Sequence, residues 1–124
     1  FHSNTYNDIA WEKMERGYYD GALIDAKRSI DIMSTSHNND TAALIYLNLQ
    51  DFDNALKYSN ESIKLDGTPS KPQHLLTRAQ ILVKLGEITM AIKDLEDALY
   101  WEDDWDDGYE DAKNLLEEIS NLNN

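Results

Sequence analysis

Three stretches of the sequence align without gaps and place small and apolar residues at the same offsets. They are YYDGALIDAKRSIDI from Tyr18, DFDNALKYSNESIKL from Asp51 and EITMAIKDLEDALYW from Glu87. Spacings of three, four and seven place side chains on one helical face, where small side chains let a neighbouring helix approach closely. Each stretch is therefore predicted to be a helix packed tightly against another. The small residues that recur are Ala22, Ser29, Ala55, Ser62, Ala91 and Ala98.

The partner of each stretch is expected directly before it in the chain. NDIAWEKMER, TAALIYLNLQ and HLLTRAQILVKL are helical in composition and period, and short turns at Gly17, Gln50 and Gly86 separate them from the three stretches. The sequence therefore predicts an all-α chain of three antiparallel helix pairs. The first helix of the second pair looks short, because STSHNND occupies residues 34–40.

A helix hairpin with a period near 34 and small residues at fixed offsets resembles the tetratricopeptide repeat (TPR) family. The resemblance implies a right-handed α-solenoid of about seven helices and a single domain over residues 4–122. Its repeats would span about 4–34, 38–67 and 72–103, with a capping helix at about 104–122. Two features depart from the family pattern: Gln50 stands where glycine is usual, and the closing proline is absent from all three repeats.

The negative charge of the chain is concentrated at its C-terminal end. The formal net charge is −13, and residues 94–124 carry 12 acids and one base, a net of −11. Such a surface repels phosphate backbones and anionic lipids, which argues against nucleic acid and membrane partners. The expected partner is a protein or peptide that is neutral to basic.

The stretch WEDDWDDGYED, residues 101–111, invites comparison with a calcium loop. With Gly108 at the sixth position of an EF-hand, the third position, which needs an oxygen ligand, is Trp105, and the twelfth, which needs a bidentate glutamate, is Asn114. A helix start fits better, with Asp104 as its N-cap and a stripe from Trp105 to Leu122 covering the last hairpin. We therefore expect no metal site and no cofactor.

In the resembled family the first helix of each pair lines a concave groove that holds a peptide or a partner's helix. One subclass grips a C-terminal carboxylate there with lysine, asparagine and arginine, but the corresponding places hold Asn7, Trp11, Thr41, Gln73 and Thr77, so this cationic grip is absent. We expect Trp11 and Leu44 to be apolar anchors, with packing under the N-terminal hairpin as the alternative for Trp11. The expected groove residues are Asn4, Asn7, Asp8, Trp11, Glu15, Thr41, Leu44, Asn48, Gln73, Thr77, Gln80, Lys84, Asp107, Glu110, Asp111 and Asn114.

Enzymatic activity is not expected. His2, His37 and His74 are far apart, and no HExxH, glycine-rich phosphate loop or GxSxG motif is present. The predicted function is a protein–protein interaction module, a scaffold or adaptor. Two alternatives stay open: a self-assembling repeat domain that pairs as a homodimer, and a regulatory domain of a larger protein. The compartment also stays open between the cytoplasm, which we favour, and export of a mature form.

Overall fold

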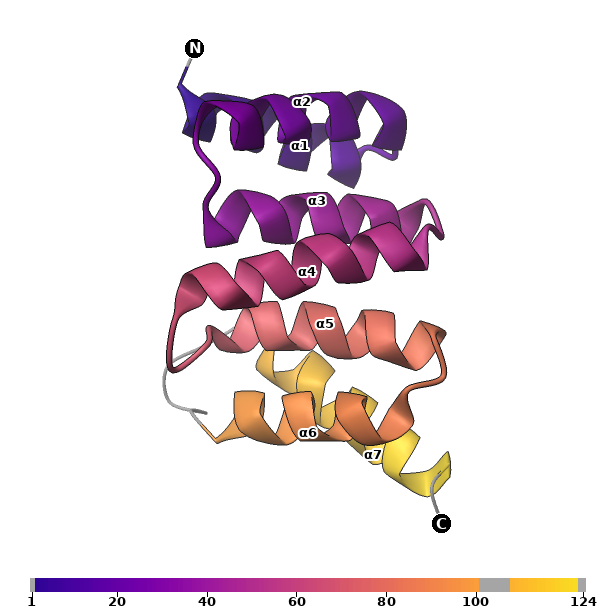
Figure 1. Ribbon diagram of the computed structural model, residues 1–124. Coiled ribbons are helices and arrows are strands. Elements are labelled where there is room, and N and C mark those ends of the chain that lie inside the picture. The colour runs from indigo at the N-terminus through magenta and orange to yellow at the C-terminus, as the bar shows by residue number, and fades with distance from the viewer. Residues whose placement is uncertain (1, 101–107, 123–124) are drawn as a thin grey trace. The chain divides into compact units, whose positions relative to one another are not determined.

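The computed structural model describes residues 2–100 and 108–122, and the regular structure in these ranges is entirely α-helical (Figure 1). The chain divides into two compact units, Phe1–Gly67 and Thr68–Asn124. The first unit holds α1 (Ser3–Glu15), α2 (Tyr19–Ile32), α3 (Ser36–Asn48) and α4 (Phe52–Asp66). The second unit holds α5 (Pro72–Lys84), α6 (Ile88–Leu99) and α7 (Tyr109–Leu122).

In the first unit α1 pairs with α2, α3 pairs with α4, and α2 packs on α3. Alanines make up most of the core between the first three helices, and larger side chains pack around them. The fully buried core residues here are Ala10, Ala22, Ala26, Ala42 and Ile45. This confirms the prediction of close helix packing, because an alanine leaves room for a neighbouring backbone at the contact.

In the second unit α5 pairs with α6, and α7 packs on α6. On α7 the expected apolar stripe is present in part. Ala112 and Ile119 are buried, whereas Leu122 is 70% exposed and does not belong to the covered face. The predicted N-cap Asp104 and the predicted stripe residue Trp105 lie outside the described residues.

Inside each pair of the first unit, the second helix contacts the first through one recurring position. In the α1–α2 pair this is Asp25, which is buried and accepts a hydrogen bond of 2.7 Å from Lys13 Nζ. In the α3–α4 pair the same position is Tyr58, whose ring stacks on Tyr46 with a centroid distance of 5.5 Å. An ion pair with a buried carboxylate and an aromatic pair thus occupy equivalent places in the repeat.

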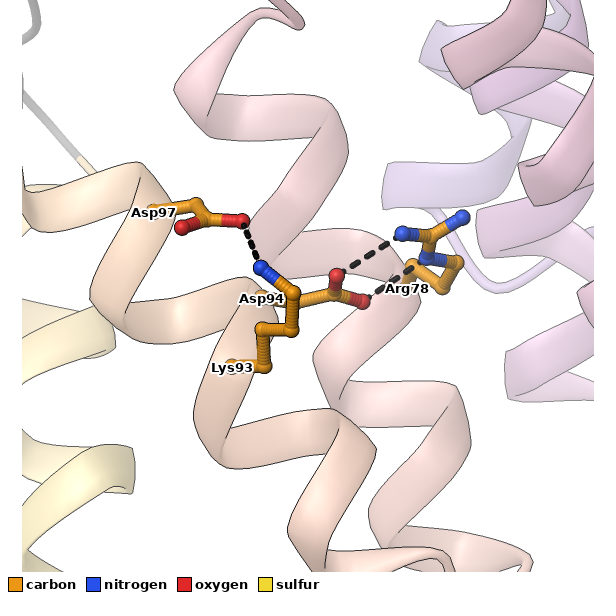
Figure 2. A network of polar contacts seen from close by, with 4 residues as sticks. All are labelled: Arg78, Lys93, Asp94 and Asp97. Carbon is orange, nitrogen blue, oxygen red and sulfur yellow. Dashed lines mark hydrogen bonds and ion pairs between the residues drawn. The ribbon is translucent and has the colours of Figure 1, made fainter.

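The α5–α6 pair fills that position with Asp94, which is 5% exposed. Arg78 binds it through two hydrogen bonds, Nε to Oδ2 at 2.7 Å and Nη2 to Oδ1 at 2.8 Å (Figure 2). Hydrogen bonding of the guanidinium to the Asp94 carboxylate, which accepts, raises the pKa of Arg78 above its ordinary value, so this guanidinium stays charged. A forked pair of this kind fixes the relative rotation of the two helices as well as their distance.

The sequence-based expectation of a short α3 was wrong. The helix begins at Ser36, so most of STSHNND is helical. Thr35 is the N-cap: its hydroxyl accepts from the Asn38 backbone N–H at 3.1 Å, and the Asn38 side-chain oxygen accepts from the Thr35 N–H at 2.9 Å. In this capping box the side chains of Thr35 and Asn38 accept from two backbone N–H groups that would otherwise bond only to water. A polar stretch therefore starts a helix here.

The three turns inside the helix pairs share one backbone geometry. Gly17, Gln50 and Gly86 have φ of 83°, 63° and 80°, and each donates to the carbonyl three residues before it. The residue after each one donates five residues back, as in Tyr18 to Lys13 at 2.9 Å. This is the Schellman arrangement, in which glycine is preferred because the left-handed backbone crowds a Cβ.

We expect Gln50→Gly to raise the free energy of unfolding by about 0.5 kcal/mol. Relief of the left-handed conformation contributes roughly 1 kcal/mol, and the greater freedom of glycine in the unfolded chain offsets about half of it. The matched reverse change Gly17→Ala should cost about 0.5 kcal/mol by the same balance, since a Cβ there meets no atom within 4 Å and only the backbone conformation opposes it. Urea unfolding followed by circular dichroism measures both; a loss of stability in Gln50→Gly would contradict the argument.

Candidate interaction surface

One face of α1 carries polar and aromatic side chains that are exposed. Asn4, Asp8, Trp11 and Glu15 recur at spacings of four, three and four, and Trp11 is 39% exposed. Lys13 of α1 and Arg16, the C-cap residue directly after it, are both engaged in ion pairs: Lys13 with Asp25 at 2.7 Å and Arg16 with Glu12 at 2.8 Å. The exposed stripe itself therefore carries two carboxylates and no base.

A hollow of about 360 Å³, open to solvent, lies beside this stripe and is lined by Asn7, Asp8, Trp11 and His37. Three of the residues come from α1, and His37 comes from the first turn of α3. Asn7 is 3% exposed, and its Oδ1 has no hydrogen-bond partner. A buried amide oxygen without a donor costs free energy in the folded protein.

The other expected groove residues of the first unit lie on α3 and differ in accessibility. Thr41 is fully buried, and its hydroxyl donates to the His37 carbonyl at 3.1 Å, so it does not present a polar group at the surface. Leu44 is half-buried and Asn48 is exposed. Asn48 Nδ2 donates to the Leu44 carbonyl at 2.8 Å within the same helix.

In the second unit the expected residues lie on α5 and α7. Thr77 is buried and donates to the Gln73 carbonyl at 3.1 Å, in the same way as Thr41. Gln73 and Lys84 are exposed, and Gln80 is half-buried. Asp107 lies outside the described residues. The α7 residues Glu110, Asp111, Asn114 and Glu118 are exposed.

Sequence reasoning missed His37 as part of this surface. The error follows from the α3 boundary: with 34–40 read as a loop, His37 has no helical register. The signal that could have located it is Thr35 followed three residues later by Asn38, a capping pair that starts the helix. From that start His37 lies one turn before Thr41 on the same helix.

Other kinds of site find no support in the described parts of the chain. Residues 2–100 and 108–122 contain no group of three or more histidine, cysteine, aspartate or glutamate side chains placed to hold a metal ion. No helix within the same ranges has the length and apolar character needed to cross a membrane.

The tetratricopeptide repeat model matches residues 39–69 and 75–104, which correspond to the α3–α4 and α5–α6 pairs. The chain belongs to the tetratricopeptide repeat family. This confirms the resemblance drawn from the recurring alanines, and it accounts for the equivalent turns at Gly17, Gln50 and Gly86. No curated protein matches the sequence.

Solved TPR domains share the fold at low identity. The first TPR domain of human RPAP3 has a TM-score of 0.85 at 22% identity, covering 96% of this chain and 90% of that one. The second TPR domain of human RPAP3, solved in complex with an HSP70 peptide, has a TM-score of 0.80 at 23% identity. The match covers 95% of this chain and 94% of that one. The Yersinia enterocolitica type III secretion chaperone SycD, solved in complex with a peptide of the translocator YopD, has a TM-score of 0.83 at 16% identity. The match covers 98% of this chain and 94% of that one. These likenesses show an all-α fold of TPR hairpins.

Proposed function

We propose that this TPR domain is a protein–protein interaction module, a scaffold or adaptor that binds a peptide segment or a helix of a partner. The observation that carries the proposal is the exposed Trp11 beside a hollow on α1 and α3. An aromatic side chain next to a pocket is the usual centre of a protein interface. Support also comes from relatives of the same fold that were solved with bound peptides of HSP90, HSP70 and YopD.

The proposed contact residues form two surfaces, one in each unit. In the first unit they are the α1 stripe, the hollow, Leu44 and Asn48. In the second unit they are exposed or half-buried polar side chains of α5 and α7: Gln73, Gln80, Lys84, Glu110, Asp111 and Asn114. The buried hydroxyls of Thr41 and Thr77 support their own helices and are not proposed as direct contacts.

The proposed partner segment is neutral to basic. With a net charge of −13, the domain attracts cations over a distance of about 10 Å at ordinary ionic strength. On α7 the exposed Glu110, Asp111 and Glu118 add to this field. Complementary charge mainly raises the association rate, so the effect should weaken as salt is added.

An array of 15-residue peptides in basic, neutral and acidic versions tests the function. Wild type should bind a subset of the basic and neutral peptides, and Trp11→Ala should lose most of that binding. The matched control is Ile24→Ala, a truncation of an α2 side chain that is 55% exposed in the same unit and lies away from the hollow. Equal binding by both variants would place the interface elsewhere, and no binding by wild type would count against a peptide-binding module.

The same array separates attraction by charge from direct contact. Changing Glu110, Asp111 and Glu118 together to their amides should slow association with basic peptides by about tenfold at low salt and leave dissociation nearly unchanged. If acidic and basic peptides bind wild type equally well, the proposed preference for basic segments is wrong.

A further inference from the structure

The lining of the α1–α3 hollow is chemically selective. Of its four residues, only Trp11 presents an extended apolar surface, while Asn7, Asp8 and His37 are polar. A hollow meant for an aliphatic side chain would bury apolar atoms on several sides. This hollow combines apolar surface, which suits the aliphatic stem of a long side chain, with the carboxylate of Asp8.

The amide oxygen of Asn7 is an acceptor held in place without a donor. Its residue is 97% buried by the fold, and Oδ1 has no hydrogen-bond partner in the described parts of the chain. The atom is buried beneath the hollow and not at its surface, so the polar group that the hollow offers to a ligand is the carboxylate of Asp8. A carboxylate accepts from an ammonium or guanidinium group and repels another carboxylate.

The charges around the hollow favour the same ligand. Asp8 and Glu15 lie on the exposed stripe, and the bases Lys13 and Arg16 are both held in ion pairs. The thirteen residues of α3 include no lysine or arginine. The partly exposed indole of Trp11 can lie against a cation and attract it through its ring electrons.

We propose that this hollow is a subsite for the side chain of a lysine or arginine in the bound peptide. Asp8 pairs with its charge, and Trp11 packs on its aliphatic stem and cation. The proposal rests on the proposed function and adds the chemical class of the anchor residue. The hollow thus selects a basic residue at one position of the partner, whereas the overall negative charge acts on any cation.

Single amino-acid probes test the subsite without a known partner. The probes are Nα-acetyl-lysine amide and Nα-acetyl-arginine amide, with the norleucine and glutamate analogues as controls of equal or similar length. They are titrated at millimolar concentration into the full chain, followed by the assigned backbone and indole N–H signals in ¹⁵N NMR. The cationic probes should shift Asn7, Asp8 and the Trp11 indole saturably, and norleucine amide should bind about tenfold more weakly.

Three variants locate the interaction. Asp8→Asn and Trp11→Leu should each lower the affinity for the lysine probe by about threefold. Asp31→Asn, the same change at an exposed α2 carboxylate away from the hollow, should leave that affinity almost unchanged. Asn7→Leu should raise the midpoint of thermal unfolding, because it removes a buried polar atom without a partner, and should leave binding of the lysine probe almost unchanged.

The outcomes separate the two proposals. If norleucine amide binds as well as lysine amide, or if the shifts spread evenly over carboxylates such as Glu110 and Asp111, the subsite is wrong, even where the array shows Trp11-dependent peptide binding. If the lysine probe binds at Asp8 and Trp11 but no peptide binds in the array, the subsite stands and the proposed function falls.

Discussion

Replacing Arg78 by leucine is expected to lower the free energy of unfolding by about 3 kcal/mol. The change leaves Asp94, which is 5% exposed, with a charge that no longer has its two hydrogen bonds from the guanidinium. Removing one partner of a buried ion pair costs about 3 to 5 kcal/mol, and the lower end applies because the Arg78 side chain is 25% exposed. Urea unfolding followed by circular dichroism measures the loss.

The neighbouring pair Lys93–Asp97 provides a matched control, since it joins the same types of group on the surface of α6 (Figure 2). Its side chains are 76% and 53% exposed, and its N–O distance is 3.2 Å, so Lys93→Leu should cost less than about 0.5 kcal/mol. The double change Arg78→Leu with Asp94→Leu should recover most of the stability, because no buried charge remains. Similar losses in the Arg78 and Lys93 variants would show that burial of Asp94 does not matter.

Asn38→Ala is expected to cost about 2 to 3 kcal/mol through loss of a buried junction between three helix ends. Asn38 Nδ2 donates to the Met33 carbonyl at 2.7 Å, to Ser29 Oγ at 3.0 Å and to Ser3 Oγ at 3.3 Å. Its side-chain oxygen also completes the capping box with Thr35. The cap accounts for about 1 kcal/mol, and the unsatisfied buried groups account for the rest.

The same substitution at Asn48 isolates the role of burial. Asn48 lies on the same helix, is exposed, and hydrogen-bonds only to the Leu44 carbonyl of its own helix among the described contacts. Asn48→Ala should change stability by less than about 0.5 kcal/mol. Hydrogen exchange at the start of α3 gives a second readout: the backbone N–H groups of residues 38 and 39 should exchange faster in Asn38→Ala and not in Asn48→Ala, and unchanged exchange would contradict a capping role.

Much of the fold could be predicted from the sequence because helix packing in this family depends on small residues at a fixed period. Ala22, Ala55 and Ala91 recur at one register, and all three are fully buried. Helix type, pairing and turn positions follow from that local pattern. The acidic face of α7 could also be predicted from the sequence, and Glu110 and Asp111 are exposed as expected.

The candidate site was predictable only in outline. The spacing of Asn4, Asp8, Trp11 and Glu15 placed them on one helical face, and they are exposed there. Register alone could not show that Thr41 and Thr77 turn inward to bond their own helices, since both sit at the edge of that face. It also could not bring His37 beside Asn7, because that depends on where α3 starts and how it packs on α1.

The sequence by itself therefore determined the all-α repeat, its helix pairs and its uneven charge, since each depends on residues within one or two helical turns. Tertiary structure alone decided which polar residues are buried and paired: Asp25 with Lys13, Asp94 with Arg78, and Asn38 with Ser29. It also decided that Asn7 Oδ1 is buried without a partner. The physical reason is that burial and hydrogen bonding between helices depend on distances across a packed interface, which a one-dimensional period does not contain.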